Sequence, residues 1–179
     1  MPFDLDPEQY EFLDFGCSAG GSLERYRRFF KVHGKGLGLD VDPEKVRLAN
    51  SKGQDAVLCD IRELKLMGRT RFILMSHFLE HIQSMADVRK IVHLSCHAAR
   101  EFVFIRQPYF DADPYLFRLG LKLFWSNWTG HPNNMTLLEL HNLLTPLFQA
   151  NKVNRFCLYG LARIFNSWSS EVHNIDSLI

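Results

Sequence analysis

Apolar residues recur along the chain with two different periods, one typical of strands and the other typical of helices. Short apolar runs ended by glycine, proline or acidic residues predict buried strands, at residues 11–16, 35–40, 56–60, 72–76 and 101–106. Between and after them, apolar side chains recur at helical spacing, which predicts helices at residues 22–32, 43–51, 84–98 and 136–150. Strands alternating with helices predict parallel βαβ units and a doubly wound sheet.

The alternation breaks at residues 108–134, which hold seven of the 23 aromatic residues. Phe117, Leu121, Phe124 and Trp128 stand at helical spacing and predict an apolar helix face. Three interpretations stay open: a cap packed on the protein's own core, a lid over a substrate pocket, or a partner interface. The tail predicts a strand at residues 155–159 and a last short strand near Val172.

Composition and charge narrow the class of protein. The net charge of +1 supplies no strong field for nucleic acid, so no nucleic-acid partner is expected. The four cysteines are far apart without a C-x-x-C pair, which favours a reducing compartment. No run approaches the roughly 20 apolar residues of a membrane span, and the N-terminus lacks a signal-peptide pattern. We therefore expect a cytoplasmic protein with no transmembrane segment.

The ends of the first three predicted strands carry residues suited to a nucleoside. In an open α/β sheet, ligands bind outside the carboxyl ends of the strands. Small residues in the loop 16–21 allow close approach of the backbone, and the next helix offers free N–H groups. Asp40 ends the second strand, where a carboxylate can accept both ribose hydroxyls. Asp60 and Ile61 end the third, and suit an adenine's amine and face.

These segments resemble the class I S-adenosylmethionine-dependent methyltransferases, in particular the small ubiquinone-biosynthesis type. The family's LDVGCGTG appears as LDFGCSAG at 13–20, and its G-x-D-x-S/D-P as GLDVDP at 38–43. Its third-strand acid is matched by Asp60, and its S-x-x-L-E-H-x by SHFLEHI at 76–82. His131 before the Thr136 helix matches a later family feature, so the resemblance spans about residues 12–148.

The resemblance implies a fold, a cofactor and a set of site residues. The fold is one Rossmann-like α/β domain over 1–179, with a mostly parallel seven-stranded-type sheet and an antiparallel C-terminal strand. The stretch 108–134 is then an aromatic helical insertion after the fifth strand. The implied cofactor is S-adenosyl-L-methionine. The cofactor-binding positions carried over are Asp14, Gly16, Cys17, Ser18, Gly20, Asp40, Val41, Asp60, Ile61, Ser76 and His77. Ser18 departs from the family, which has glycine there.

The implied activity is methyl transfer to a small-molecule acceptor that the sequence does not identify. The aromatic segment favours an apolar or aromatic acceptor and leaves peripheral membrane contact through 115–128 open. A hydroxyl or protonated amine acceptor needs a general base, for which the candidates are His131, then His77, His81 and Tyr109. The acceptor atom, the retention of turnover and the oligomeric state are not determined by the sequence.

Two alternatives of other classes remain. A non-catalytic methyltransferase-like scaffold is suggested by Ser18 and by the lack of an unambiguous base. An NAD(P)-binding oxidoreductase also fits Asp40, although the loop G-x-S-x-G-G is not a clean G-x-G-x-x-G and the chain leaves little room for a substrate domain.

A metalloprotease is a third alternative, because His77–His81 has the spelling H-x-x-E-H. That motif requires both histidines on one helix face and a third ligand, for which Glu139 and Glu171 are the candidates. Here the motif follows directly on a strand, which places His77 in a loop. We therefore expect no metal, and expect replacement of His81 to leave the metal content at zero.

Overall fold

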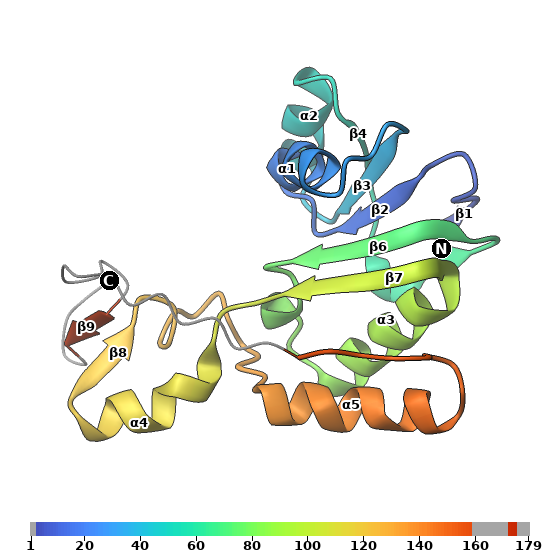
Figure 1. The fold of residues 1–179 in the computed structure, drawn as a ribbon. Helices are drawn as coiled ribbons and strands as arrows, with labels where there is room; N and C mark the ends of the chain where they lie inside the picture. The colour runs from blue at the N-terminus through green and yellow to red at the C-terminus, as the bar shows by residue number, and fades with distance from the viewer. Residues whose placement is uncertain (1–2, 159–171, 175–179) are drawn as a thin grey trace. The chain divides into compact units, whose positions relative to one another are not determined.

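A computed structural model describes residues 3–158 and 172–174 of the chain. Its main sheet has five parallel strands in the order β4-β3-β2-β6-β7 (Figure 1). The strands are β2 Phe12–Phe15, β3 Gly36–Asp40, β4 Asp55–Leu58, β6 Thr70–Ser76 and β7 Ala99–Arg106. Strand order reverses between β2 and β6, the place where doubly wound folds bind ligands. The predicted α/β class and parallel sheet are confirmed.

Chain contacts divide the protein into two compact units. The first contains Met1–Leu79 and Ala86–Gln107, and the second Glu80–Met85 and Pro108–Ile179. The prediction of a single domain over 1–179 stays a prediction. No helix in the described residues is both long and apolar enough to cross a bilayer.

The helices of the first unit lie close to their predicted positions. They are α1 Gly21–Phe29, α2 Pro43–Ser51 and α3 Met85–Ala98. The Asp42 carboxylate accepts the backbone N–H of Glu44 and Lys45, and Pro43 occupies the first turn, so α2 begins where predicted. Three elements of this unit escaped prediction: the strands β1 Phe3–Leu5 and β5 Leu64–Leu66, which pair in parallel, and the one-turn 3-10 helix η1 Ile61–Glu63.

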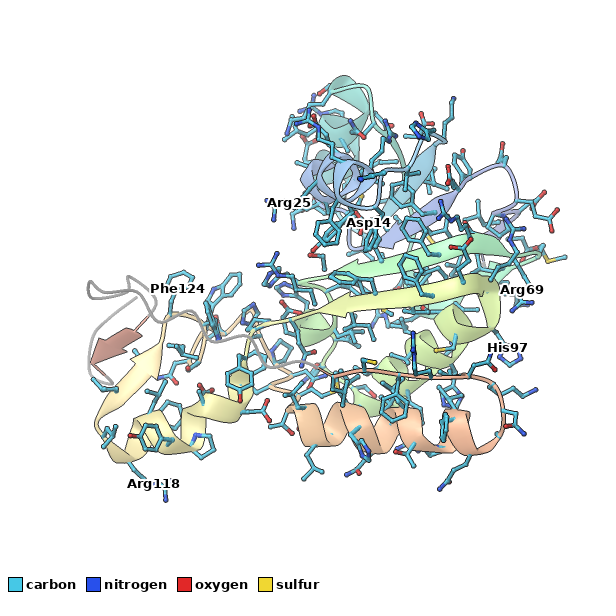
Figure 2. The ribbon with its side chains drawn as sticks, viewed as in Figure 1. Asp14, Arg25, Arg69, His97, Arg118 and Phe124 are labelled. Atoms are coloured by element: carbon cyan, nitrogen blue, oxygen red, sulfur yellow. The ribbon has the colours of Figure 1, made fainter. Side chains whose placement is uncertain are left out.

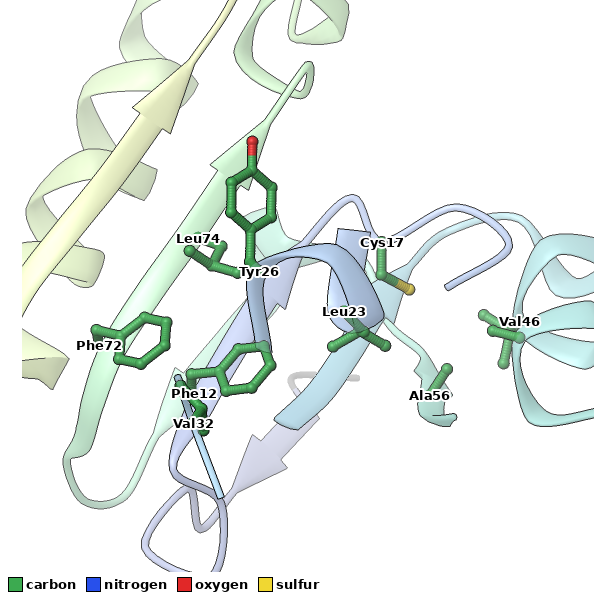
Figure 3. Close-up of a cluster of buried hydrophobic side chains, with 10 residues drawn as sticks. Phe12, Cys17, Leu23, Tyr26, Val32, Val46, Ala56, Phe72 and Leu74 are labelled. Atoms are coloured by element: carbon green, nitrogen blue, oxygen red, sulfur yellow. The ribbon is translucent and has the colours of Figure 1, made fainter. Parts of the chain in front are cut away.

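Aromatic stacking forms the centre of this unit's core. β2 is buried at every position because β3 and β6 flank it on both edges. The ring of Phe72 stacks on Phe12 with centroids 5.0 Å apart and on Phe102 at 4.7 Å. Phe30 packs on Phe72 at 5.3 Å. Figure 3 shows Phe12 and Phe72 together with the aliphatic side chains of the same cluster.

The second unit contains shorter elements. They are η2 Leu79–His81 at its boundary with the first unit, η3 Phe110–Ala112, α4 Asp113–Arg118, β8 Leu121–Leu123, α5 Leu137–Gln149 and β9 Val172–Asn174. β8 pairs with β9 antiparallel. The predicted capping box of α5 is present, since Thr136 and Glu139 cap each other's backbone N–H.

Three details of the predicted fold need correction. The apolar helix face through Phe117 and Trp128 is wrong, because Gly120 has a left-handed backbone (φ 69°) that ends α4 and leads into a strand. The main sheet has five strands in the described residues rather than seven, since the C-terminal strand near Val172 pairs with β8 instead. Residues 155–158 form no strand, and Tyr159 lies outside the described residues.

Replacing Phe72 by alanine should lower the free energy of unfolding by about 3–5 kcal/mol, because a fully buried ring with stacked neighbours leaves a cavity. Phe29→Ala is the matched control: that ring is 70% exposed, so its loss should cost well under about 1 kcal/mol. Urea denaturation of the three proteins measures both effects. Equal destabilisation by the two substitutions would contradict the packing described.

Candidate functional site

The loop after β2 has the backbone shape of a ligand cradle. Gly16, Ser18 and Gly20 all adopt left-handed φ angles, of 74°, 49° and 81°. A Cβ on Gly16 would lie 2.5 Å from Cδ2 of Phe78, so any other residue would have to displace the Phe78 ring as well as adopt a left-handed backbone. Ser18 takes the same kind of conformation with a side chain, which costs roughly 1–2 kcal/mol. The loop therefore keeps its shape despite the missing glycine, at the expense of local strain.

Asp40 connects this loop to the end of β3. One carboxylate oxygen accepts the backbone N–H of Ser18 at 2.8 Å, and the other that of Asp42 at 3.0 Å. Only 8% of the residue is exposed. The backbone N–H groups of Gly16 and Cys17 also donate to the Leu39 carbonyl, at 2.8 and 3.2 Å. The predicted cradle and the predicted ribose acceptor therefore form one hydrogen-bonded structure.

Asp14 is a fully buried carboxyl group on β2 (Figure 2). The Ser22 hydroxyl, on the first turn of α1, donates to its Oδ2. Burial raises the pKa of Asp14 to about 7, the Ser22 hydrogen bond opposes this, and the nearby Asp40 carboxylate adds to the increase. Two acidic groups thus lie close together at the strand ends, and one of them holds its proton near neutral pH.

After β4, the predicted adenine-binding residue Asp60 forms an ion pair that the sequence did not predict. The Asp60 side chain caps η1 and forms a two-pronged ion pair with Arg62, with Nη2–Oδ2 at 2.6 Å and Nε–Oδ1 at 2.9 Å. This Arg62 contact lowers the pKa of Asp60. Ile61 is buried, whereas 62% of Val41 is exposed and accessible to a ligand. The prediction did not include Arg62, although a basic residue two positions after an acid is a signal for such a pair.

Ser76 and His77 lie at the end of β6. The Ser76 hydroxyl lies 3.0 Å from the Tyr26 hydroxyl, so Tyr26 connects α1 to the end of β6. The helical spacing of Tyr26 in the sequence predicted only that it would lie in the core. His77 adopts a left-handed backbone (φ 54°), and its N–H donates to the Arg106 carbonyl at 2.8 Å. The chain therefore turns sharply at His77, as the loop prediction requires.

Cys17 is a predicted cofactor residue whose side chain packs into the protein. Its thiol is buried against Gly38, where a Cβ would lie 2.5 Å from Sγ. Burial, with the nearby Asp14 and Asp40 carboxylates, raises its pKa to about 12. Only the Cys17 backbone is left to contact a cofactor.

The other predicted catalytic residues, Tyr109 and His131, belong to the second unit. The His131 ring lies edge-on to Trp128, with centroids 4.5 Å apart, and to His81 at 5.0 Å. Glu80 completes this group: one ligand atom from each of Glu80, His81 and His131 lies within 4.8 Å of the other two. No sequence pattern predicts this arrangement, since His131 is fifty positions from His81.

No protein-family model and no curated protein matches this chain. Solved structures match its fold. The plantazolicin methyltransferase BpumL, crystallised with S-adenosylhomocysteine (SAH), has a TM-score of 0.60 at 16% identity, covering 78% of this chain and 55% of BpumL. A SAM dependent methyltransferase from Archaeoglobus fulgidus has a TM-score of 0.55 at 17% identity, covering 78% and 62%. The YcgJ protein of Bacillus subtilis has a TM-score of 0.56 at 18% identity, covering 79% and 62%.

The matches show that the chain has the class I S-adenosylmethionine-dependent methyltransferase fold, as the sequence resemblance implied. This chain spans about 55 to 62% of the length of these proteins. Identity this low supports the architecture alone.

Replacement of Asp14 by asparagine should change the pH dependence of stability. A carboxyl whose pKa rises from 3.8 to about 7 on folding stabilises the protein fully below pH 4, and that contribution is lost as the pH rises through 7. The neutral Asp14→Asn variant lacks this loss, so its stability relative to wild type should increase between pH 4 and pH 8, by on the order of 4 kcal/mol at most. Urea denaturation across that range measures the difference. A difference independent of pH would show that Asp14 is ionised throughout.

Substitutions at Ser18 should reveal the loop strain. Ser18→Gly removes the left-handed penalty but adds chain entropy, so it should raise the free energy of unfolding by up to about 1 kcal/mol. Ser18→Val, β-branched at the same φ, should lower it by at least about 1 kcal/mol. Thermal and urea unfolding measure both. A valine variant as stable as wild type would rule out the left-handed conformation.

Proposed function

We propose that the chain is an S-adenosylmethionine-dependent methyltransferase that acts on a small-molecule acceptor. The fold supports this proposal, and the Asp40 carboxylate is the observation that carries it. The first unit supplies residues that fit each part of the cofactor: the ribose, the adenine and the methionine part.

Asp40 fits the ribose. An ionised carboxylate has about four acceptor positions, and two of them are taken by the backbone N–H groups of Ser18 and Asp42. The remaining positions can accept the two ribose hydroxyls. Because the two backbone hydrogen bonds fix the carboxylate before a ligand arrives, little side-chain entropy is lost on binding.

Val41 and Asp60 fit the adenine. An exposed valine directly after the ribose acceptor offers an apolar face to a ring. The Asp60 carboxylate can accept a hydrogen bond from the exocyclic amine of adenine. It would do so either while still paired with Arg62 or after that ion pair has opened. Since both side chains of that ion pair are substantially exposed, the pair is worth at most about 1 kcal/mol and is a small obstacle.

Asp14 and Asp40 fit the charge of the methionine part. S-adenosylmethionine supplies a methyl group already activated on a positively charged sulfur. Two neighbouring acidic groups favour a cation, and a bound ammonium would lower the pKa of Asp14 and release its proton. The chain's residues then need to orient the acceptor in line with the methyl group and to exclude water.

His77 is the candidate base in the first unit, and His131 and Tyr109 are the candidates in the second. A base is needed only when the acceptor gives up a proton as its lone pair bonds to the methyl carbon. Exposed aromatic and apolar side chains in the second unit support an apolar or aromatic acceptor, namely Tyr115, Phe117, Leu119, Phe124 and Trp128. The four free cysteines support a reducing, cytoplasmic location.

A non-catalytic nucleoside-binding scaffold is the second candidate. It is favoured by the strained Ser18 in the cradle and by Arg62 on the Asp60 carboxylate. Both proposals require nucleoside binding, and they differ only in turnover.

Isothermal titration with SAH tests the shared step. We expect micromolar binding by wild type, and at least tenfold weaker binding by Asp40→Asn, since hydrogen bonds to a charged group contribute about 1.5–3 kcal/mol. Asp55→Asn, which removes an aspartate in an exposed ion pair at the start of β4, is the control and should bind like wild type.

No SAH binding by folded wild type would reject the proposal, and binding of NADH in its place would favour an oxidoreductase. SAH binding without methyl transfer to any aromatic acceptor tested would favour the scaffold. Circular dichroism of the Asp40→Asn variant checks that the loop connection is not required for folding.

A further inference from the structure

We propose that Glu80, His81 and His131 form a binding site for a divalent transition-metal ion. The site lies entirely in the second unit, and it does not rest on the methyltransferase proposal. It also reverses the expectation from the sequence that the protein holds no metal.

The donor atoms are close enough to share one ion. A carboxylate oxygen of Glu80 and ring nitrogens of His81 and His131 lie within 4.8 Å of one another. Around a tetrahedral ion with bonds of about 2.0–2.2 Å, neighbouring donors are about 3.3 Å apart. Each pair of donors would therefore have to approach by at most about 1.5 Å to reach that separation.

His81 is already oriented as metal-binding histidines are. Its Nδ1 lies 2.7 Å from the carbonyl oxygen of Gly130, so the backbone fixes Nδ1 as the protonated nitrogen and leaves the Nε2 lone pair as the donor. Metal-bound histidines nearly always make such a second hydrogen bond, because it fixes the ring and its tautomer. Gly130 directly precedes His131, so one loop orients one histidine and supplies the other.

The two segments that carry the donors are joined by backbone contacts. The Asn133 N–H donates to the Glu80 carbonyl at 3.2 Å, which joins the two segments. Within the second segment, the His131 N–H donates to the Trp128 carbonyl at 2.9 Å. The Trp128 ring packs edge-on against both histidines, with centroids 4.5 Å from His131 and 5.9 Å from His81. These contacts hold Glu80 and His81, at the turn η2, beside the loop that carries His131.

Burial and donor chemistry indicate the kind of ion. Glu80 is only 1% exposed, His131 is half-buried and His81 is exposed, so the group opens to solvent on one side. Two imidazoles and one carboxylate favour zinc, iron(II) or another first-row ion over magnesium or calcium, and leave a coordination position open.

The site differs from the H-x-x-E-H motif that the sequence spells. His77 belongs to the first unit and contributes nothing to the group. Glu139, one candidate third ligand, instead accepts the backbone N–H of Thr136 at 2.8 Å, and Glu171 lies outside the described residues. His131 supplies the third donor.

Titration of the chelator-treated 179-residue chain with Zn²⁺ and with Co²⁺ tests the site. We expect one equivalent of either ion, with visible Co²⁺ absorption of a low-symmetry nitrogen and oxygen site. Glu80→Gln, His81→Ala and His131→Ala should each weaken binding at least tenfold. His141→Ala, which removes an exposed histidine of α5 in the same unit, should bind as wild type does.

Wild type that binds no stoichiometric Zn²⁺ or Co²⁺, or binding that survives all three substitutions, would overturn the site. Glu80→Gln keeps the size of the buried side chain, so it separates loss of a ligand from loss of folding, which circular dichroism checks. SAH titration with and without Zn²⁺ separates the two proposals, because the metal can bind in a chain that fails to bind SAH.

Discussion

The hydrogen bonds of the Asp40 carboxylate hold the site of the first unit together. Parallel pairing places Phe15 beside Leu39, so the loop after β2 begins next to the end of β3. Asp40 then accepts N–H groups from both sides, from Ser18 in the loop and from Asp42 before α2. A single side chain thereby fixes two strand ends and the start of a helix. The left-handed Ser18 is tolerated because its N–H makes this bond.

The same arrangement places a second carboxyl group, that of Asp14, where burial and the nearby Asp40 carboxylate raise its pKa. Asp14 is fully buried close to Asp40, and only Ser22 donates to its side chain among the described residues. If Asp14 had no function, a neutral side chain at this position would make the protein more stable. A buried acid that keeps its proton near neutral pH is typical of a functional site, and a cationic ligand beside it would favour the ionised carboxylate.

The sequence predicted those features of the fold and of this site that depend on residues close together in the chain. The bounds of α2 and the capping box of α5 follow from cap residues a few positions apart. The loop after β2 follows from small residues between a strand and a helix. Contacts between distant residues were not predictable: Tyr26 meets Ser76 fifty positions away, and β8 finds its partner β9 about fifty positions later. In residues 117–128 the helical spacing of apolar residues gave a wrong prediction. The left-handed backbone of Gly120 ends α4 there, and the strand β8 follows instead of a longer helix.

The segment 76–82 shows why spacing alone does not define a metal site. Two histidines four apart share a face only if a helix joins them, but η2 covers Leu79–His81 and the chain turns at His77. His77 is therefore not part of the helical turn that carries Glu80 and His81. What remains, a glutamate and a histidine side by side, needs a third donor from elsewhere in the fold. A loop fifty residues later supplies it, and orients His81 through the Gly130 carbonyl. The arrangement of donors at this position therefore depends on the tertiary structure, and a short sequence motif can neither establish nor exclude a metal site there.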